Sequence, residues 1–189
     1  MQTERYESVM NLFATLLLAH LIADFPLQTN GLYRLKSRHW AGVLLHAAIH
    51  YLITALLIKN PLTHWHALIP LFVLHVIIDW VKLQVDFKFQ SLGFLLDQMI
   101  HLLALVLLAA WLSKISGILS PMILYPALAY ALIPGLLMFL SVLTIDLERF
   151  SSNSVRWPRL KSSQIVMLSH LVGYPLVVSI VVMRFAGCV

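Results

Sequence analysis

Six apolar stretches, separated by short polar segments, constrain this chain more than any other feature of its sequence. A helix of about 20 apolar residues crosses the hydrocarbon core of a bilayer, and the stretches at residues 8–25, 40–58, 66–85, 92–113, 121–143 and 163–185 are close to that length. The chain is 60% hydrophobic and 11% charged, whereas soluble domains carry roughly 25% charged residues. The sequence therefore predicts an all-α, polytopic membrane protein with about six transmembrane helices, in which residues 1–189 form a single transmembrane domain.

Four of these stretches each carry two ionisable residues four positions apart. The pairs are His20/Asp24, His46/His50, His75/Asp79 and Asp97/His101. Because four residues make about one helical turn, both members of a pair project from the same face of their helix. Ionisable groups inside membrane segments are costly and mark functional sites. We therefore expect all four pairs to converge on one site.

The four pairs also form an internal repeat. The segment LAHLIAD, which ends at Asp24, resembles VLHVIID, which ends at Asp79, and His46/His50 aligns with Asp97/His101. The sequence thus predicts two parallel helical-hairpin repeats, at about residues 8–58 and 66–113, with a site at their interface. Together they would form a four-helix core, and the helices within residues 121–185 would flank it. Asn30-Gly31 is read as a turn after the first span.

Basic residues are distributed unequally between the two sides of the predicted bundle, which gives its orientation. The loops after spans one, three and five contain Arg34, Lys36, Arg38, Lys82, Lys88, Arg149, Arg156, Arg159 and Lys161, whereas the other side holds Arg5, Lys59, Lys114 and Arg184. Positive residues favour the cytoplasmic side, so we expect both termini outside. All four ionisable pairs then lie at a similar depth in the cytoplasmic half.

The residue types in the pairs are those of a metal site. Imidazole and carboxylate groups one helical turn apart can bind one ion from a single helix, as in zinc metalloproteases. The histidines and aspartates His20, Asp24, His46, His50, His75, Asp79, Asp97 and His101 exceed what one tetrahedral zinc needs. They suit one or two divalent ions, of zinc, manganese or iron. Two ions would also balance the three aspartates, beside which Lys82 is the only fixed cation that we expect.

Neighbouring residues suggest supporting roles. Gln28 and Gln98 lie next to Asp24 and Asp97 in helical register or sequence, and histidine ligands usually donate their second ring N–H to such oxygens. Asp97 or Asp24 would act as general base. The basic side chains Arg34, Lys36, Arg38 and Lys82 would bind an anionic headgroup. A purely structural alternative has each pair form its own hydrogen bond and Asp79 pair locally with Lys82.

The motifs His20-x3-Asp24-Phe25-x2-Gln28, Lys36, His46-x3-His50, His75-x3-Asp79-x2-Lys82 and Asp97-Gln98-x2-His101 resemble those of a bacterial inner-membrane family known as domain of unknown function 3307. The resemblance covers roughly residues 12–105 and implies a multi-pass protein of the bacterial inner membrane. A looser, architectural similarity is to membrane-bound metal-dependent hydrolases, which also place His and Asp on apolar helices.

These features predict a metal-dependent membrane enzyme, most simply a hydrolase of a lipid-linked phosphate or ester at the cytoplasmic face. An oxidative di-iron site is a chemical variant of this hypothesis. The alternative from another class is a transporter of divalent metal or protons. A third is a structural subunit whose polar cluster sets helix register. The sequence shows no nucleotide-binding or nucleic-acid-binding motif and no feature that indicates an oligomer.

Overall fold

The computed structural model describes residues 2–150 and 162–186, and these residues form seven helices and no strand. The helices are α1 (Gln2–Asp24), α2 (Asn30–Lys36), α3 (Trp40–Leu57), α4 (Trp65–Gln84), α5 (Gln90–Trp111), α6 (Pro121–Phe150) and α7 (Ser162–Phe185). All except α2 are long and apolar enough to cross a membrane, which confirms the predicted all-α, six-span fold. Of the basic residues used for orientation, Arg156, Arg159 and Lys161 lie outside the described residues.

Two details differ from the sequence prediction. α1 begins at Gln2, before the predicted span, and α6 continues to Phe150, because helix formation does not stop where the apolar stretch ends. The predicted turn at Asn30-Gly31 is wrong, since both residues belong to α2. The Thr29 side chain accepts a hydrogen bond from the Leu32 N–H (3.3 Å) and so caps this short helix at its start.

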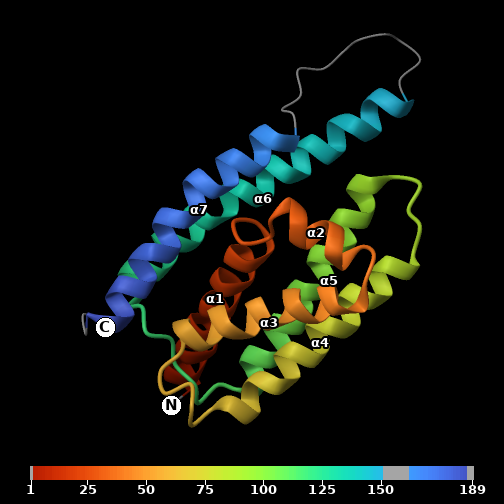
Figure 1. The fold of residues 1–189 in the computed structure, drawn as a ribbon. Helices are drawn as coiled ribbons and strands as arrows, with labels where there is room; N and C mark the ends of the chain where they lie inside the picture. The colour runs from red at the N-terminus through yellow and green to blue at the C-terminus, as the bar shows by residue number, and fades with distance from the viewer. Residues whose placement is uncertain (1, 151–161, 187–189) are drawn as a thin grey trace.

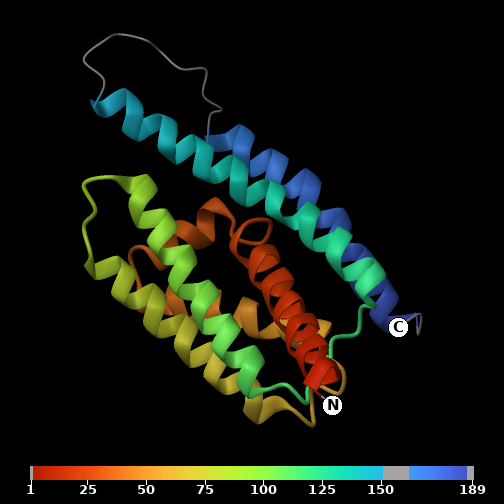
Figure 2. The ribbon, with the colours of Figure 1, turned by 180° about the vertical axis from the view of Figure 1, so that it is seen from behind.

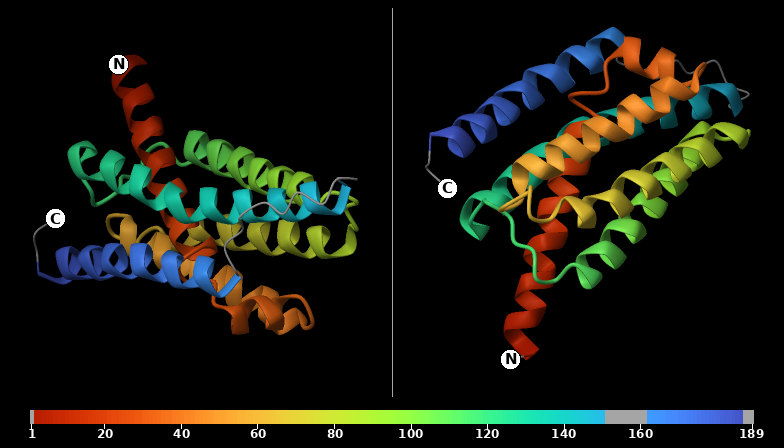
Figure 3. Two further views of the ribbon diagram at one scale, coloured as in Figure 1. Left: turned by 90° about the horizontal axis from the view of Figure 1, so that it is seen from above. Right: turned by 60° about the horizontal axis from the view of Figure 1, so that its bottom comes forward.

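The six long helices form a four-helix core and a flanking hairpin (Figures 1 and 2). α1 runs through the molecule and packs against α3, α5 and α6, while α4 packs between α3 and α5. α2 lies on α3, and α6 and α7 pack against each other along one side of the core (Figure 1). Figure 3 shows the first turns of α1 extending past the other helices. Successive long helices alternate in direction, so the α1–α3 and α4–α5 connections lie at the same end.

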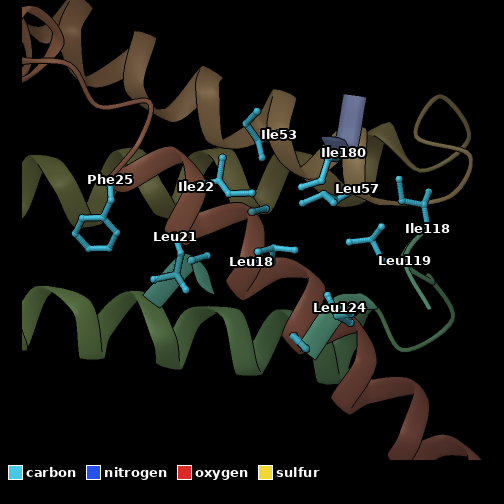
Figure 4. Close-up of a cluster of buried hydrophobic side chains, with 13 residues drawn as sticks. Leu18, Leu21, Ile22, Phe25, Ile53, Leu57, Ile118, Leu119, Leu124 and Ile180 are labelled. Carbon is cyan, nitrogen blue, oxygen red and sulfur yellow. The ribbon is translucent and has the colours of Figure 1, made fainter. Parts of the chain in front are cut away.

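Apolar side chains fill the interior of the core away from the end that carries the α1–α3 and α4–α5 connections. One cluster joins α1, α3, α6 and α7, including Leu18, Ile22, Leu57 and Ile180 (Figure 4). A second cluster fills the other half of the four-helix core and consists of Leu12, Leu16, Ile58, Ala67, Leu68, Leu71, Leu105, Leu108, Ala109 and Ile115.

The α3–α4 and α5–α6 loops pair with each other at the end of the core opposite α2. The Lys59 N–H donates to the Ser116 carbonyl (2.9 Å), and the Ile118 N–H donates to the Leu57 carbonyl (2.8 Å). The side chains of Ile58 and Ile118 are buried beneath these backbone bonds. The end of the core opposite α2 is therefore closed by paired backbone and apolar packing.

The flanking hairpin contacts the chain where α1 ends. A Cβ atom at Gly173 of α7 would lie 2.0 Å from the Cβ of Pro26, so only glycine lets α7 approach this closely. Pro26 is fully buried and follows Asp24 by two positions. The hairpin thus fixes the corner of the chain that leads out of α1.

We expect Gly173→Ala to lower the free energy of unfolding by about 1–3 kcal/mol, because the proline ring is rigid and cannot move away from the added methyl group. Thermal unfolding of the detergent-solubilised protein measures this. Gly31→Ala is the matched control, since its added Cβ would meet only the Thr29 hydroxyl at 3.8 Å. Equal melting temperatures for the two variants would contradict the close packing of α7 on Pro26.

Candidate metal centre

The structure brings the four ionisable pairs into one buried cluster at the α2 end of the core. His20 and Asp24 lie late in α1, and His75 and Asp79 lie late in α4; His46, His50, Asp97 and His101 lie early in α3 and α5. Because α1 and α4 run opposite to α3 and α5, all eight residues reach the same level. Seven of them are buried, and the Asp24 side chain is only 10% exposed.

The first group of ligand atoms surrounds the Asp24 carboxylate, and we call Asp24, His46, His50 and His75 the Asp24 subsite. The Oδ1 atom of Asp24 lies 3.0 Å from His46 Nε2 and 3.1 Å from His50 Nε2, and these two nitrogens are 3.3 Å apart. One ligand atom from each of the four residues fits within 4.8 Å of all the others.

These separations match those between ligands of one metal ion. The edge of a tetrahedron is about 1.6 times the centre-to-corner distance, which is about 3.3 Å for a zinc–nitrogen bond of about 2.0 Å. Octahedral coordination of other divalent ions gives a somewhat shorter edge, close to 3.0 Å, even though the metal–ligand bonds are longer. The Asp24 subsite therefore has the spacing and the ligand types that a divalent cation requires.

A second group consists of His75, Asp79 and His101, again with ligand atoms within 4.8 Å of one another. We call these three residues the Asp79 subsite together with the neighbouring Asp97, whose Oδ1 atom lies 3.6 Å from His101 Nδ1. The ring of His75 lies between the two groups, with centroids 3.7 Å from His50 and 4.5 Å from His101.

Several atoms of the cluster have no hydrogen-bond partner among the described residues. They are buried and comprise His46 Nδ1, His75 Nε2, Asp79 Oδ2, Asp97 Oδ1 and His101 Nε2. A buried polar atom without a partner costs about 1–3 kcal/mol, so several in one place indicate a ligand that binds them together. The imidazole nitrogens and carboxylate oxygens among them can each bind a divalent ion through a lone pair.

Two lysines contribute to the cluster in a way that the sequence analysis did not foresee. Lys36 Nζ lies 2.7 Å from Asp79 Oδ1, and Lys82 Nζ contacts Asp97 Oδ2. The local Asp79–Lys82 pair is therefore not formed, and Lys82 is not the only fixed cation near the aspartates. The approach of α2 to α3 places Lys36, because a Cβ at Gly42 would lie 2.3 Å from the Lys36 backbone nitrogen.

The second lysine also corrects the charge balance. Three carboxylates and two ammonium groups leave the cluster with one net negative charge when its histidines are neutral. With one bound divalent ion, the net charge of the cluster becomes one positive. With two ions and both lysines in place, the net charge would be three positive. Low-dielectric surroundings penalise such an excess strongly. With both lysines paired as observed, charge favours one ion.

Gln98 links the two halves of the cluster. Its Nε2 donates to Asp24 Oδ2 (3.1 Å) and to Asp97 Oδ2 (3.3 Å), and its Oε1 lies 3.4 Å from His20 Nε2. Gln28 is half-buried, and no hydrogen bond among the described residues joins it to the cluster. Arg34 and Arg38 are exposed on and just after α2, so they lie on the surface beside the site.

Asp146 of α6 supports the site and had no signal in the sequence. Its carboxylate accepts hydrogen bonds from the backbone N–H groups of Gln90 (3.1 Å) and Ser91 (2.7 Å) and from the Ser91 hydroxyl (2.6 Å). It therefore caps the start of α5, the helix that carries Asp97 and Gln98. Sequence reasoning considers capping residues that adjoin a helix, and this one comes from a distant helix.

Comparison with known proteins gives one match. The model of a family described as "Protein of unknown function (DUF3307)" matches residues 12–125, which cover α1 to the start of α6 and include the whole cluster. No curated protein matches the chain, and no solved structure does.

The observed lysine pairing can be tested by double-mutant cycles on protein from which a chelator has removed divalent ions. We expect Lys36→Met and Asp79→Asn to couple by about 1–3 kcal/mol in unfolding free energy, because removing one partner leaves a buried charge unpaired. Lys82→Met and Asp97→Asn should couple in the same way. A stronger coupling of Asp79 to Lys82 than to Lys36 would contradict the arrangement.

Proposed function

The chain belongs to the DUF3307 family, and we propose that it is a metal-dependent integral membrane enzyme that hydrolyses a lipid-linked phosphate or ester. The observation that carries this proposal is the Asp24 subsite, where a carboxylate oxygen and two imidazole nitrogens lie 3.0–3.3 Å apart. A divalent ion held there supplies a Lewis acid that polarises the scissile group and activates water. Zinc, manganese and iron all suit this ligand set.

The shape of the core supports an enzyme over a transporter. A transporter needs polar groups along the whole path through the bilayer. Beyond the cluster, the interior of α1, α3, α4 and α5 is mainly apolar, around Leu16, Leu71 and Leu105, and the paired loops at Lys59 and Ile118 close it. The buried hydroxyls of Thr15 and Thr54 are uncharged, and that of Thr15 donates to the Asn11 carbonyl of its own helix. We instead place access to the cluster at the α2 end, where the Lys82 side chain is 37% exposed.

The other residues of the cluster take distinct roles in this proposal. Asp24 lies among histidines and acts as a ligand, whereas Asp97 Oδ1 has no hydrogen-bond partner among the described residues and is the better placed of the two to accept a proton. Lys36 and Lys82 hold the anionic part of the substrate. Arg34 and Arg38, exposed beside them, attract it to the surface.

Metal analysis of protein purified without chelator tests the proposal. We expect about one tightly bound divalent ion per chain, lost in His50→Ala because this imidazole is one of the closest ligands. His66→Ala is the control, since that histidine is exposed at the start of α4 and lies outside the cluster. Wild-type protein that purifies and remains stable without metal would refute the proposal in favour of a structural role for the cluster.

Two assays on the metal-loaded protein then separate enzyme from transporter. The enzyme releases phosphate or fatty acid from membrane lipid extracts, and His50→Ala abolishes this release. The transporter alternative instead gives uptake of the metal or of protons into sealed vesicles. Uptake without hydrolysis would replace the proposed function with the alternative.

We also propose that the protein lies in the bacterial inner membrane with its α2 end in the cytoplasm, since Arg34, Lys36, Arg38, Lys82 and Lys88 gather at that end. In a Cys188→Ser background, a membrane-impermeant maleimide applied to spheroplasts should label Leu62→Cys, because Leu62 is 89% exposed in the α3–α4 loop. Asp86→Cys, in the α4–α5 loop, should be labelled only after permeabilisation. The reverse pattern would invert the proposed orientation.

A further inference from the structure

The Asp79 subsite differs from the Asp24 subsite in what its atoms contact. Four of its atoms, His75 Nε2, Asp79 Oδ2, Asp97 Oδ1 and His101 Nε2, are buried and have no hydrogen-bond partner among the described residues. Two of these atoms, His75 Nε2 and Asp79 Oδ2, lie 3.4 Å apart, whereas in the Asp24 subsite the Asp24 Oδ1 atom lies within 3.1 Å of both His46 Nε2 and His50 Nε2. Any account of the cluster has to explain what the four atoms bind.

The chemistry of these atoms favours a cation as that partner. Carboxylate oxygens only accept, which covers Asp79 Oδ2 and Asp97 Oδ1. His101 Nδ1 lies 2.9 Å from the Asp97 backbone carbonyl and must donate to it, so the Nε2 atom of the neutral ring carries a lone pair. Three acceptors therefore lie in the subsite, and the nitrogen beside them, His75 Nε2, is 3.4 Å from Asp79 Oδ2, which is longer than a good N–H···O hydrogen bond. A divalent ion satisfies such lone pairs, and one ligand atom each from His75, Asp79 and His101 lie close enough together to bind it, which leaves Asp97 Oδ1 as the proton acceptor.

Each aspartate of this subsite uses its second oxygen to bind a lysine. Asp79 Oδ1 contacts Lys36, and Asp97 Oδ2 contacts Lys82, while the oxygens without partners are the other member of each carboxylate. A divalent ion bound to Asp79 Oδ2 shares its carboxylate with the Lys36 ammonium group, and the Lys82 ammonium group is held on the neighbouring Asp97. Charge repulsion in these low-dielectric surroundings opposes simultaneous occupancy.

We propose that the Asp79 subsite is a second divalent-cation site that Lys36 and Lys82 keep closed until they are drawn away by the phosphoryl group of the substrate. This inference rests on the proposed function and extends it, because it makes the second ion conditional and selects a phosphorylated substrate over a carboxylic ester. The lysines act as internal counter-cations for Asp79 and Asp97, and the ion takes their place.

The two lysines differ in how exposed they are. The Lys82 side chain is 37% exposed at the end of α4, so its ammonium group can turn to the surface. The Lys36 side chain is only 10% exposed, but it lies in the last turn of the short helix α2, beside the exposed residues Arg34 and Ser37, so a movement of this turn would release it. The two ammonium groups meet the cluster from α2 and α4 and, once released, require a new anionic partner.

An oxyanion meets that requirement better than an ester carbonyl. A phosphoryl group carries negative charge and several acceptor oxygens for two ammonium groups, whereas an ester carbonyl is neutral. Binding of the phosphoryl group and of the second ion is therefore mutually favourable, since each removes an obstacle to the other. The resting protein holds one ion, and the substrate-bound protein holds two.

Titration with manganese tests this coupling. The protein is first freed of divalent ions with a chelator and placed in nanodiscs of zwitterionic lipid, and the bound manganese is counted by electron paramagnetic resonance. For wild type, we expect one tight equivalent and a second that binds at least about tenfold more weakly. The Lys36→Met, Lys82→Met double variant should bind the second equivalent at least about tenfold more tightly than wild type. A purely structural role for the lysines predicts no such gain.

Two controls keep the result interpretable. Lys36→Arg, Lys82→Arg retains both charges and should keep the second ion weak, and Arg34→Met removes an exposed charge from the same helix and should behave as wild type. Inorganic phosphate should tighten the second equivalent severalfold in wild type and leave the double methionine variant unchanged. Nanodiscs containing a lipid phosphomonoester distinguish the source: an effect there identifies a lipid headgroup, and an effect of free phosphate alone identifies a soluble phosphate.

Unchanged second-ion affinity in the double methionine variant, or no effect of either phosphate source on wild type, would overturn the inference. This failure is distinct from that of the proposed function. The first tight ion, removed by His50→Ala, reports on the Asp24 subsite, whereas the lysine variants report only on the second ion. The arginine double variant retains both charges, so a change in second-ion affinity in this variant would be caused by altered folding and not by loss of charge.

Discussion

The arrangement of this protein depends on placing three carboxylates inside a bundle of apolar helices. An isolated carboxylate in such surroundings is strongly destabilising, and the chain compensates with side chains from every helix of the core. Asp79 and Asp97 each contact a lysine, while the contacts of Asp24 among the described residues are with histidines and Gln98. Asp24 is thus the carboxylate whose charge the protein does not neutralise itself. A bound cation is the simplest partner for it.

The flanking hairpin makes sense in relation to this cluster. α7 packs against Pro26 through Gly173, next to the end of α1 that bears Asp24. α6 supplies Asp146, which caps the start of α5 and so fixes the helix that bears Asp97 and Gln98. Gln98 in turn donates to both Asp24 and Asp97. The hairpin therefore holds, from outside, the two helices that Gln98 joins inside, and the spacing of the ligand atoms depends on both.

How much of this could be predicted from the sequence follows from which interactions are local. The spacing of His46 and His50 places both on one helix face, and alternating helix directions bring the pairs to one level, so the convergence of the cluster was predictable. The partner of Asp79 was not. Lys82, three positions away, was the obvious local candidate, yet Lys36 pairs with Asp79 because α2 forms and packs against Gly42.

The same limit explains α2 and Asp146. The Asn30-Gly31 sequence is typical of a turn, but Thr29 caps a helix there, and docking on α3 stabilises a helix too short to be stable alone. The cap of α5 is contributed by residue 146, and no local rule connects it with residues 90 and 91. Interactions between distant helices decide these features, and a single sequence does not record them.

The two halves of the repeat predicted from the sequence have diverged in a direction that fits the two subsites. His46 of the first half aligns with Asp97 of the second, so the first half supplies two imidazoles from α3 where the second supplies one carboxylate and one imidazole from α5. An extra carboxylate raises the cost of burial, and Lys82 compensates for it within the second half. Lys36, although it follows the first half's helix, compensates Asp79 of the second. The first half thus retains neutral ligands around a single uncompensated charge, while the second has become balanced by lysines. A duplicated site that diverges in this way can hold one ion at all times and a second only when its internal counter-cations are removed.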